Sequence, residues 1–243
     1  MNRSNTYPYK IQPQDVDFQC KVTTASLINI LLTTAGYNAD ENGFGIRHLN
    51  VINCSWVLLN LAVEMEKIPF QYEKITIETW IENVGRASTI RNFVIYDSKK
   101  KKIGQAISNW VMIDLNTRRV QDLFNLKSIR NFETNISLEI EKPMKLNSIE
   151  GNLVDSFKVK YSDIDINGHT SSKRYVEWIS DCLSLDIYKE KQLQRFEINF
   201  MNEMFFGNEV SIFANEITEN DYRYEISSLE KTSCRARMVM RNL

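Results

Sequence analysis

Hydrophobic and polar positions alternate most clearly along residues 74–82, KITIETWIE. The isoleucines of this stretch fall on one side of an extended chain and its glutamates and tryptophan on the other, which is the period of a β-strand. Runs rich in β-forming residues follow at 88–96 and 103–113, with the lysine-rich turn 97–102 between them. These three segments predict an antiparallel meander.

A helix that is apolar on nearly all sides precedes this meander. Thr23 and Thr24 can cap it, because threonine hydroxyls accept hydrogen bonds from the first N–H groups of a helix. Such a helix must be buried. A curved antiparallel sheet wrapped around it, the hot-dog architecture, would bury it, with strands before Thr23 and after Leu59 completing the sheet. The apolar positions of the helix are Ala25, Leu27, Ile28, Ile30, Leu31 and Leu32.

The second half of the chain repeats this order of elements. A strand is expected near residues 157–161 and a helix from about Thr170 to Leu185. We therefore predict an α+β protein with a tandem double hot-dog fold, each half a curved antiparallel sheet around a central helix. The strand-like runs of the second half lie at 193–204, 209–217, 222–230 and 233–241.

The two helices align at an offset of 147 residues, which places Thr23 against Thr170, whereas Phe70 and Phe205 align at 135. The first half therefore carries about twelve extra residues after its helix. We assign these residues to a loop at 42–45 and to the segment 48–59, where the apolar spacing predicts an additional short helix.

A polar, irregular stretch separates the two halves. The chain has 243 residues, which is long enough for two domains that each bury a core. We predict an N-terminal domain at 1–123, a linker at 124–151 and a C-terminal domain at 152–243.

The bulk composition is that of a folded globular protein, with 43% hydrophobic and 25% charged residues. The formal net charge of −1 provides no general positive field for nucleic acid, and we interpret the lysines at 99–102 as a solubilising turn. No run approaches the roughly 20 apolar residues of a membrane span, and no apolar run follows the first basic residue. We expect a soluble, cytoplasmic protein that binds no nucleic acid.

Cysteines and histidines are too sparse for a metal site. There is no C-x-x-C pair, and only two histidines are present, so zinc is not expected. Four cysteines in a chain of this length are also too few for the disulfide framework of a small secreted domain. We expect buried free thiols and no cofactor. The cysteines are Cys20, Cys54, Cys182 and Cys234.

Polar residues suited to catalysis gather just ahead of the second helix. Asp165, Asn167 and His169 lie within five residues of one another, and Gly168 between them would permit close approach of a substrate. Free N–H groups at the start of the helix near Thr170 would stabilise a developing oxyanion. At the matching positions the first half has Phe18, Cys20 and Val22.

Glu203 departs from the first half in the same way. It stands in the apolar stretch 198–206, where the first half has Ile68 at the 135 offset. A carboxylate that loses solvation becomes a better base for activating water. The alternative is purely structural, with turn and cap hydrogen bonds at Asp165 and Asn167 and with Glu203 facing solvent.

Long words of the sequence resemble the acyl-ACP thioesterase family of plant plastids and bacteria, and the likeness covers nearly the whole chain. In the first half they are IETWIENVGRASTIRNFVIYD (77–97), GQA (104–106), SNWVM (108–112) and NTRR (116–119). In the second half Asp165-x-Asn167-x-His169 matches the family's D-x-N-x-H, Tyr175-x-x-Trp178 matches the helix that follows, and Glu203 falls at the catalytic glutamate of the family.

This resemblance implies hydrolysis of the thioester of fatty acyl-acyl carrier protein, within fatty acid biosynthesis. Glu203 would be the general base, Asn167 and His169 would orient the water and the thioester carbonyl, and Asp165 would support them. The first domain would hold the acyl chain, although its tryptophans could equally be plain core. Candidate substrate-binding residues are Trp56, Trp80, Trp110, Gly168, Thr170 and Ser171.

The implied partner is an acyl carrier protein with an acyl group on its phosphopantetheine arm. An acidic carrier needs only a local basic patch, for which a solvated surface is the alternative interpretation. Association into a homodimer is left open. The candidate docking residues are Arg86, Arg91, Arg118, Arg119, Lys173 and Arg174.

Two departures from the family concern the site. Thr170-Ser171-Ser172 stands where the family usually has Val-Asn-Asn or Val-Asn-Ser, and Met204 stands where many plant members have cysteine. A thioether cannot be a nucleophile, so attack by water remains. A thiol leaving group with a pKa of about 8.5 needs no strong general acid.

Three rival functions remain from the sequence. A hot-dog hydratase would carry D-x-N-P-x-H, with histidine five residues after aspartate, whereas His169 follows Asp165 by four and no proline is present. An acyl-CoA thioesterase would use the same chemistry on a different carrier. A non-catalytic protein that binds the acyl group or its carrier would show no thiol release.

Overall fold

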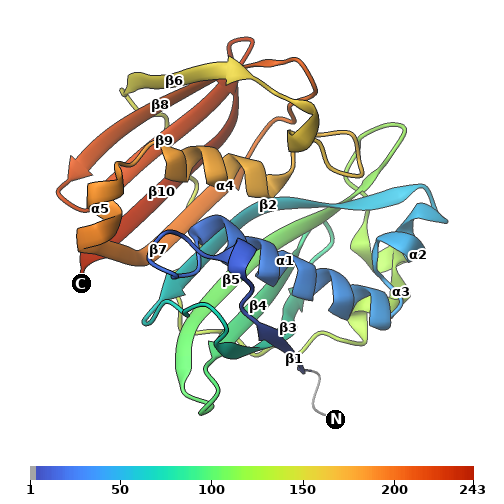
Figure 1. Ribbon diagram of the computed structural model, residues 1–243. Coiled ribbons are helices and arrows are strands. Elements are labelled where there is room, and N and C mark those ends of the chain that lie inside the picture. The colour runs from blue at the N-terminus through green and yellow to red at the C-terminus, as the bar shows by residue number, and fades with distance from the viewer. Residues whose placement is uncertain (1–3) are drawn as a thin grey trace.

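Both halves of the chain fold with the same order of elements (Figure 1). The computed structural model describes residues 4–243. The first half contains β1 (Asn5–Lys10), a 3-10 turn (Pro13–Asp15), α1 (Thr24–Glu41), α2 (Ile46–Asn50), β2 (Cys54–Met65), β3 (Lys74–Val84), β4 (Thr89–Tyr96) and β5 (Lys102–Asp114). The second half contains β6 (Asn152–Lys158), a 3-10 turn (Tyr161–Asp163), α4 (Ser172–Asp181), α5 (Leu185–Glu190), β7 (Lys191–Phe200), β8 (Glu209–Thr218), β9 (Asp221–Ser228) and β10 (Lys231–Asn242).

Within residues 4–243 one antiparallel sheet of ten strands runs through both halves, in the order β1-β3-β4-β5-β2-β7-β10-β9-β8-β6. Each half therefore has the same internal strand order, and the halves meet where β2 pairs with β7. This pairing extends from Asn60 opposite Asn199 to Glu64 opposite Arg195. The predicted α+β double hot-dog fold is confirmed, whereas the domain division at 124–151 stays a prediction.

The two long helices lie inside the curve of the sheet (Figure 1) and contact each other. Thr23 caps α1 as expected, since its hydroxyl accepts a hydrogen bond of 3.1 Å from the N–H of Ser26. Apolar side chains on α1, such as Leu27 and Leu31, are almost completely buried, as are Val176 and Ile179 on α4. The helices and the concave face of the sheet thus form the main core.

Three sequence predictions of element bounds were wrong. The helix expected at 170–185 is α4, which ends at Asp181, and a separate short helix, α5, begins at Leu185. The short helix expected at 48–59 exists as α2 but ends at Asn50, and the range from Cys54 onward is strand, because these residues pair with β5, and further along with β7 as well. The strand expected at 193–204 ends at Phe200, which leaves Glu203 in the loop that follows.

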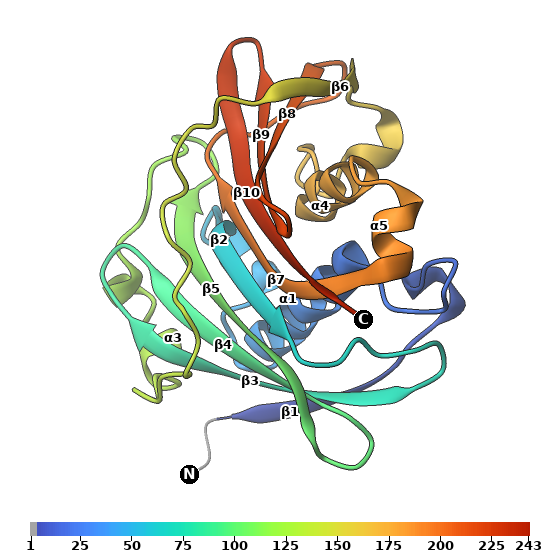
Figure 2. The same ribbon diagram turned by 90° about the vertical axis from the view of Figure 1, so that its left-hand side faces the viewer.

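The segment between β5 and β6 runs along the outer, convex side of the sheet (Figure 2). It contains a 3-10 turn (Leu123–Asn125) and α3 (Lys127–Arg130). Beyond α3 its backbone is held by side chains of the sheet: the carbonyl of Ile136 accepts a hydrogen bond of 2.8 Å from the Trp80 indole, and the carbonyl of Glu139 accepts one of 2.9 Å from Gln105. The irregular segment is therefore bound to the sheet by polar contacts.

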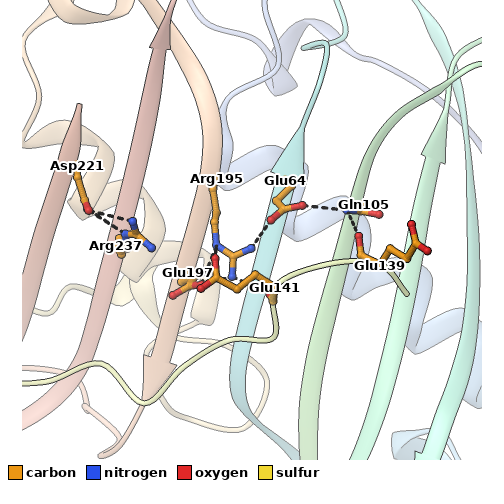
Figure 3. Close-up of polar contacts among 8 residues, drawn as sticks. All are labelled: Glu64, Gln105, Glu139, Glu141, Arg195, Glu197, Asp221 and Arg237. Carbon is orange, nitrogen blue, oxygen red and sulfur yellow. Dashed lines mark hydrogen bonds and ion pairs between the residues drawn. The ribbon is translucent and has the colours of Figure 1, made fainter. Parts of the chain in front are cut away.

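A buried ion-pair network joins the two halves beneath this segment (Figure 3). Arg195 on β7 forms ion pairs with Glu197 of its own strand and with Glu64 on β2, and it donates a hydrogen bond of 2.8 Å to the carbonyl of Glu141. Glu197 is completely buried. Removing one partner of a buried pair leaves an uncompensated charge, so this network fixes the seam between β2 and β7.

Candidate active site

A cavity of about 940 Å³ opens where the two halves meet. This volume is at the upper end of the usual range for small-molecule sites, roughly 300–1,000 Å³. The first half supplies mainly apolar wall, from α1, β2 and the end of β5, and the second half supplies the polar residues. The lining includes Leu32, Ala35, Trp56 and Trp110 from the first half and Asp165, Asn167, His169 and Glu203 from the second.

The loop from Asp165 to His169 is braced by the Asp165 carboxylate. Its Oδ1 accepts hydrogen bonds from the N–H of Asn167 at 2.8 Å and of His169 at 3.4 Å, and the N–H of Asp165 donates to the His169 carbonyl at 2.8 Å. Gly168 has φ +79°, a conformation that costs glycine little, and the space beside it is open. Asp165 therefore holds the loop, as a supporting residue would.

His169 and Glu203 come together on the cavity wall. Their Nδ1 and Oε1 atoms are 3.3 Å apart, and the imidazole packs edge-on against Phe205 with ring centroids 5.1 Å apart. The side chains are 20% and 35% exposed, so both are partly shielded and still reachable from the cavity. The predicted association of these two residues is thus present in the fold.

Arg118 is the site residue whose position sequence reasoning missed. Its guanidinium forms an ion pair with the same Oε1 of Glu203, across the boundary between the halves, and it lines the cavity. Within residues 4–243, Oε2 of Glu203 accepts no hydrogen bond. A cation interpreted as a docking residue is therefore bound to the candidate base.

The turn that carries Arg118 is held by Asp114. Oδ1 of Asp114 accepts hydrogen bonds from the N–H groups of Thr117 at 2.7 Å and Asn116 at 3.0 Å. These bonds, the one from Thr117 first, hold the pKa of the Asp114 carboxyl below its usual value. Arg118 adopts φ +57°, in the left-handed region.

The helix start differs from the sequence prediction by two residues. The N–H of Thr170 donates to the Met204 carbonyl at 2.8 Å and the N–H of Ser171 donates to Asp163 at 2.9 Å, so neither is free for an oxyanion. The first helical residue is Ser172, which lines the cavity. Its N–H and that of Lys173 make no hydrogen bond within residues 4–243, so they are the available donors.

The first half contains the same loop with other side chains. Oδ1 of Asp17 accepts hydrogen bonds from the N–H groups of Gln19 at 2.8 Å and Lys21 at 3.0 Å, and its own N–H donates to the Lys21 carbonyl at 2.8 Å. Cys20 has φ +60° at the position of Gly168. The backbone of this loop therefore matches that of 165–169.

This match corrects the alignment of the two halves by one residue, from an offset of 147 to 148. The predicted contrast with Phe18, Cys20 and Val22 was wrong, because the equivalents of Asp165, Asn167 and His169 are Asp17, Gln19 and Lys21. Thr23, which caps α1, corresponds to Ser171. The remaining chemical differences are lysine against His169 and Ile68 against Glu203.

Several predicted substrate-binding residues lie elsewhere. Trp56 and Trp110 line the cavity as expected, but Trp80 is absent from its wall because strand alternation places this side chain under the outer segment, bonded to Ile136. Ser171 is not among the lining residues; it occupies the N-cap position of α4, where its side chain makes no capping hydrogen bond. Thr170 lines the cavity and its hydroxyl, although buried, has no hydrogen-bond partner within residues 4–243.

The predicted basic patch is only partly a free surface. Arg91 is buried at 5% exposure, so its assignment to carrier docking was wrong. Lys173 and Arg174 are paired with Glu177, and Arg86 lies 3.3 Å from an Asp122 oxygen. Arg119 is exposed.

No cysteine lines this cavity. Cys54 and Cys234 are buried free thiols, as expected, but Cys20 is exposed. Burial raises the pKa of Cys182 to about 11. Burial likewise raises the pKa of the Tyr175 phenol on the cavity wall, so this group stays protonated. Within residues 4–243 no group of three or more metal-binding side chains is found, and no helix has the length and apolarity to cross a membrane.

Comparison with known proteins places both halves in one family. Family models match residues 3–125, as acyl-ACP thioesterase N-terminal domain, and 146–242, as acyl-ACP thioesterase C-terminal domain. A solved acyl-ACP thioesterase from Bacteroides thetaiotaomicron is 40% identical, with a TM-score of 0.93, over 99% of this chain and 98% of that one. The 12:0-ACP thioesterase from Umbellularia californica, 19% identical, shares the fold with a TM-score of 0.88 over 100% of this chain and 99% of that one.

Among curated proteins, the oleoyl-acyl carrier protein thioesterase of Coriandrum sativum is 24% identical over 228 residues. The match covers 85% of this chain and 61% of the coriander protein, so the chain spans about three fifths of the length of that relative. Since the two family models together cover nearly the whole chain, this protein belongs to the acyl-ACP thioesterase family.

Proposed function

We propose that this protein hydrolyses the thioester of fatty acyl-acyl carrier protein and releases the free fatty acid. The observation that carries the proposal is the contact of 3.3 Å between His169 and Glu203 on the wall of a large cavity that is otherwise mainly apolar. An apolar chamber beside a carboxylate–imidazole pair suits a substrate with a hydrocarbon tail and a hydrolysable head. Membership of the family supports the same substrate class.

In the proposed reaction Glu203 is the general base. Its Oε1 is occupied by His169 and Arg118, which leaves Oε2 to accept a hydrogen bond and then a proton from water. The water oxygen attacks the thioester carbonyl carbon, with His169 and Asn167 orienting the two reactants. Asp165 keeps the loop of both residues in place.

The negative charge that develops on the carbonyl oxygen needs donors at the start of α4. The N–H groups of Ser172 and Lys173 are free within residues 4–243 and lie at the positive end of the helix dipole. Collapse of the intermediate breaks the C–S bond, and the proton held by Glu203 returns to the departing thiolate. No covalent acyl-enzyme is needed, which agrees with the buried Met204 at the position of the plant cysteine.

The proposed partner is the acyl carrier protein, docked through its phosphopantetheine arm. Of the cations predicted for this role, Arg119 and Arg86 are exposed and are not among the residues that line the cavity, so they remain candidates for docking. The cytoplasmic location, the role in fatty acid biosynthesis and the association state stay predictions.

Thiol release from a panel of acyl carrier thioesters tests the proposed function. We expect release by the wild type and loss of release in Glu203→Ala and His169→Ala, with Lys21→Ala in the equivalent loop as the matched control. Equal rates of thiol release in the wild type and both site variants would show that Glu203 and His169 are not active-site residues. Acyl-CoA substrates and an enoyl-thioester hydration assay, run in parallel, separate the two rival enzymes, and tight carrier binding without thiol release would indicate the non-catalytic alternative.

A further inference from the structure

Arg91 is a buried cation on the wall of the same cavity. It lies on β4 and is 5% exposed. Its Nη1 donates hydrogen bonds to Oδ1 of Asn38 on α1 at 2.7 Å and to Oγ1 of Thr79 on β3 at 3.2 Å. These two bonds hold the guanidinium in place between the helix and the sheet.

No carboxylate balances this charge. Within residues 4–243 Arg91 forms no ion pair, whereas the other deeply buried arginine, Arg195, is paired with Glu197 and Glu64. Burial lowers the pKa of Arg91 to about 10, so the group is still charged at neutral pH. A buried charge without an ionic partner is costly, because it has lost water and gained no opposite charge.

Most of the donor capacity of Arg91 is also unused. Of its five N–H groups, the two on Nη1 are bonded as described above, and those on Nε and Nη2 make no hydrogen bond within residues 4–243. An otherwise mainly apolar cavity thus contains a fixed, charged donor whose remaining N–H groups have no protein partner.

The position of β4 places this donor far from the proposed reaction centre. β4 is separated from β7, whose end leads to Glu203, by β5 and β2. Arg118, which contacts Glu203, follows the end of β5 at Asp114. Arg91 lies opposite Ser108 on β5, and the six residues between Ser108 and Asp114 span about 20 Å at about 3.3 Å per residue. A substrate whose thioester lies at Glu203 would therefore meet Arg91 with the distal part of its acyl chain.

We propose that Arg91 makes the cavity selective for acyl chains that carry an oxygen on their distal part, such as a hydroxyl group. This proposal rests on the proposed function and names the substrate class of that site. A distal hydroxyl accepts a hydrogen bond from the free N–H groups of Arg91. A plain hydrocarbon long enough to reach Arg91 covers the guanidinium without replacing its lost solvation, so the same residue limits the length of unsubstituted chains.

Hydrolysis of two matched series of acyl carrier thioesters tests this proposal. One series has saturated chains of increasing length, and the other has the same chains with a terminal hydroxyl. We expect kcat/KM of the wild type to fall in the first series once the chain reaches Arg91, and the hydroxyl to raise it by about tenfold at that length. In Arg91→Met the hydroxyl preference should disappear and longer saturated chains should be accepted. Arg91→Lys keeps a cation and should retain part of the preference.

Binding of the free acids provides a readout that does not depend on turnover. The dissociation constants of saturated acids and their terminal hydroxy analogues are measured by calorimetry with the wild type and both variants. If the protein hydrolyses no thioester and yet binds the hydroxy acids more tightly, only the proposed function fails. Equal affinity and equal kcat/KM for the two series in the wild type would overturn the role of Arg91, whether or not Arg91→Met folds.

Discussion

The loop at residues 17–21 and the loop at 165–169 have the same backbone hydrogen bonds and different side chains. Each begins with an aspartate that accepts two N–H groups of its own loop. In both halves of this chain the aspartate therefore holds the frame of the loop ahead of the helix. What distinguishes the second loop is His169 in place of Lys21, together with Glu203 in place of Ile68. The comparison teaches that the proposed chemistry depends on two side chains placed on a common scaffold.

Substituting glutamine for His169 in one loop and for Lys21 in the other should have the largest and most unequal effects on kcat. His169→Gln is expected to lower kcat for acyl carrier thioesters by about 10²-fold or more, because the imidazole that contacts Glu203 is lost. Lys21→Gln, the same change at the equivalent position of the first half, should leave kcat unchanged. Steady-state thiol release measures kcat of both variants. Similar losses of kcat in the two variants would contradict a special role of His169.

Removing Arg118 should have the next largest effect. Arg118→Ala frees Oε1 of Glu203 from its ion pair, so the carboxylate is less firmly oriented, and we expect kcat to fall about tenfold with KM changed little. Arg118→Lys should recover part of kcat, since it keeps the charge. A rise in KM at constant kcat would instead assign Arg118 to carrier docking. For comparison, Arg119→Ala at a candidate docking residue should leave kcat unchanged.

Replacing Asp17 and Asp165 by alanine should lower the free energy of unfolding in both cases and kcat in only one. Asp17→Ala and Asp165→Ala each remove two hydrogen bonds to backbone N–H groups, so both should lower the free energy of unfolding by about 1–2 kcal/mol. Only Asp165→Ala should also lower kcat, because only its loop carries His169. Urea unfolding combined with thiol release checks this, and an Asp17→Ala variant of unchanged stability would contradict the common frame.

The outer faces of the two halves should differ slightly in their response to acid. In the first half the segment after α3 contacts neutral Trp80 and Gln105, and its Lys142 lies 3.4 Å from Glu82. In the second half β9 and β10 carry Asp221 bonded to both Arg237 and Arg223. Burial alone would raise the pKa of Asp221, but these hydrogen bonds lower it below its usual value. The stabilisation is therefore present above the unfolded pKa of about 3.9 and is lost as the pH falls through the lower folded value.

Asp221→Asn measures this contribution. We expect the variant to be less stable than the wild type by about 1 kcal/mol near neutral pH, with the difference shrinking as the pH falls from the unfolded pKa of about 3.9 through the lower folded pKa of Asp221. Urea unfolding at several pH values gives the difference, which should not be accompanied by a change in kcat. A stability difference that is independent of pH would show that the ionised carboxylate of Asp221 is not the source of the stabilisation.

Local patterns in the sequence were sufficient to predict most helices and strands, but they were insufficient to predict which residues contact one another. The alternation at 74–82 predicts β3 and even places Trp80 on the side opposite Ile77 and Ile81, although we still assigned it to the substrate. The one-residue error in aligning the halves arose because capping residues stand at both Thr170 and Ser171, and only the hydrogen bonds of the structure show that Ser171 matches Thr23.

The candidate site was predictable where its residues are close in the sequence. Asp165, Asn167 and His169 share one loop, so their clustering is visible in the chain itself. The contact between Arg118 and Glu203 joins residues 85 positions apart, and no periodicity or spacing connects them. The same holds for the burial of Arg91, which depends on how α1 packs on β4.

The most direct test of the central claim is the behaviour of Glu203→Gln, which keeps the shape of the side chain and removes its charge. The measurement is single-turnover thiol release from a bound acyl carrier thioester, together with the dissociation constant of that complex. We predict that binding is retained and that release falls by about 10²–10⁴-fold. Release at the wild-type rate from the bound complex would contradict the account, because Glu203 could then not be the general base.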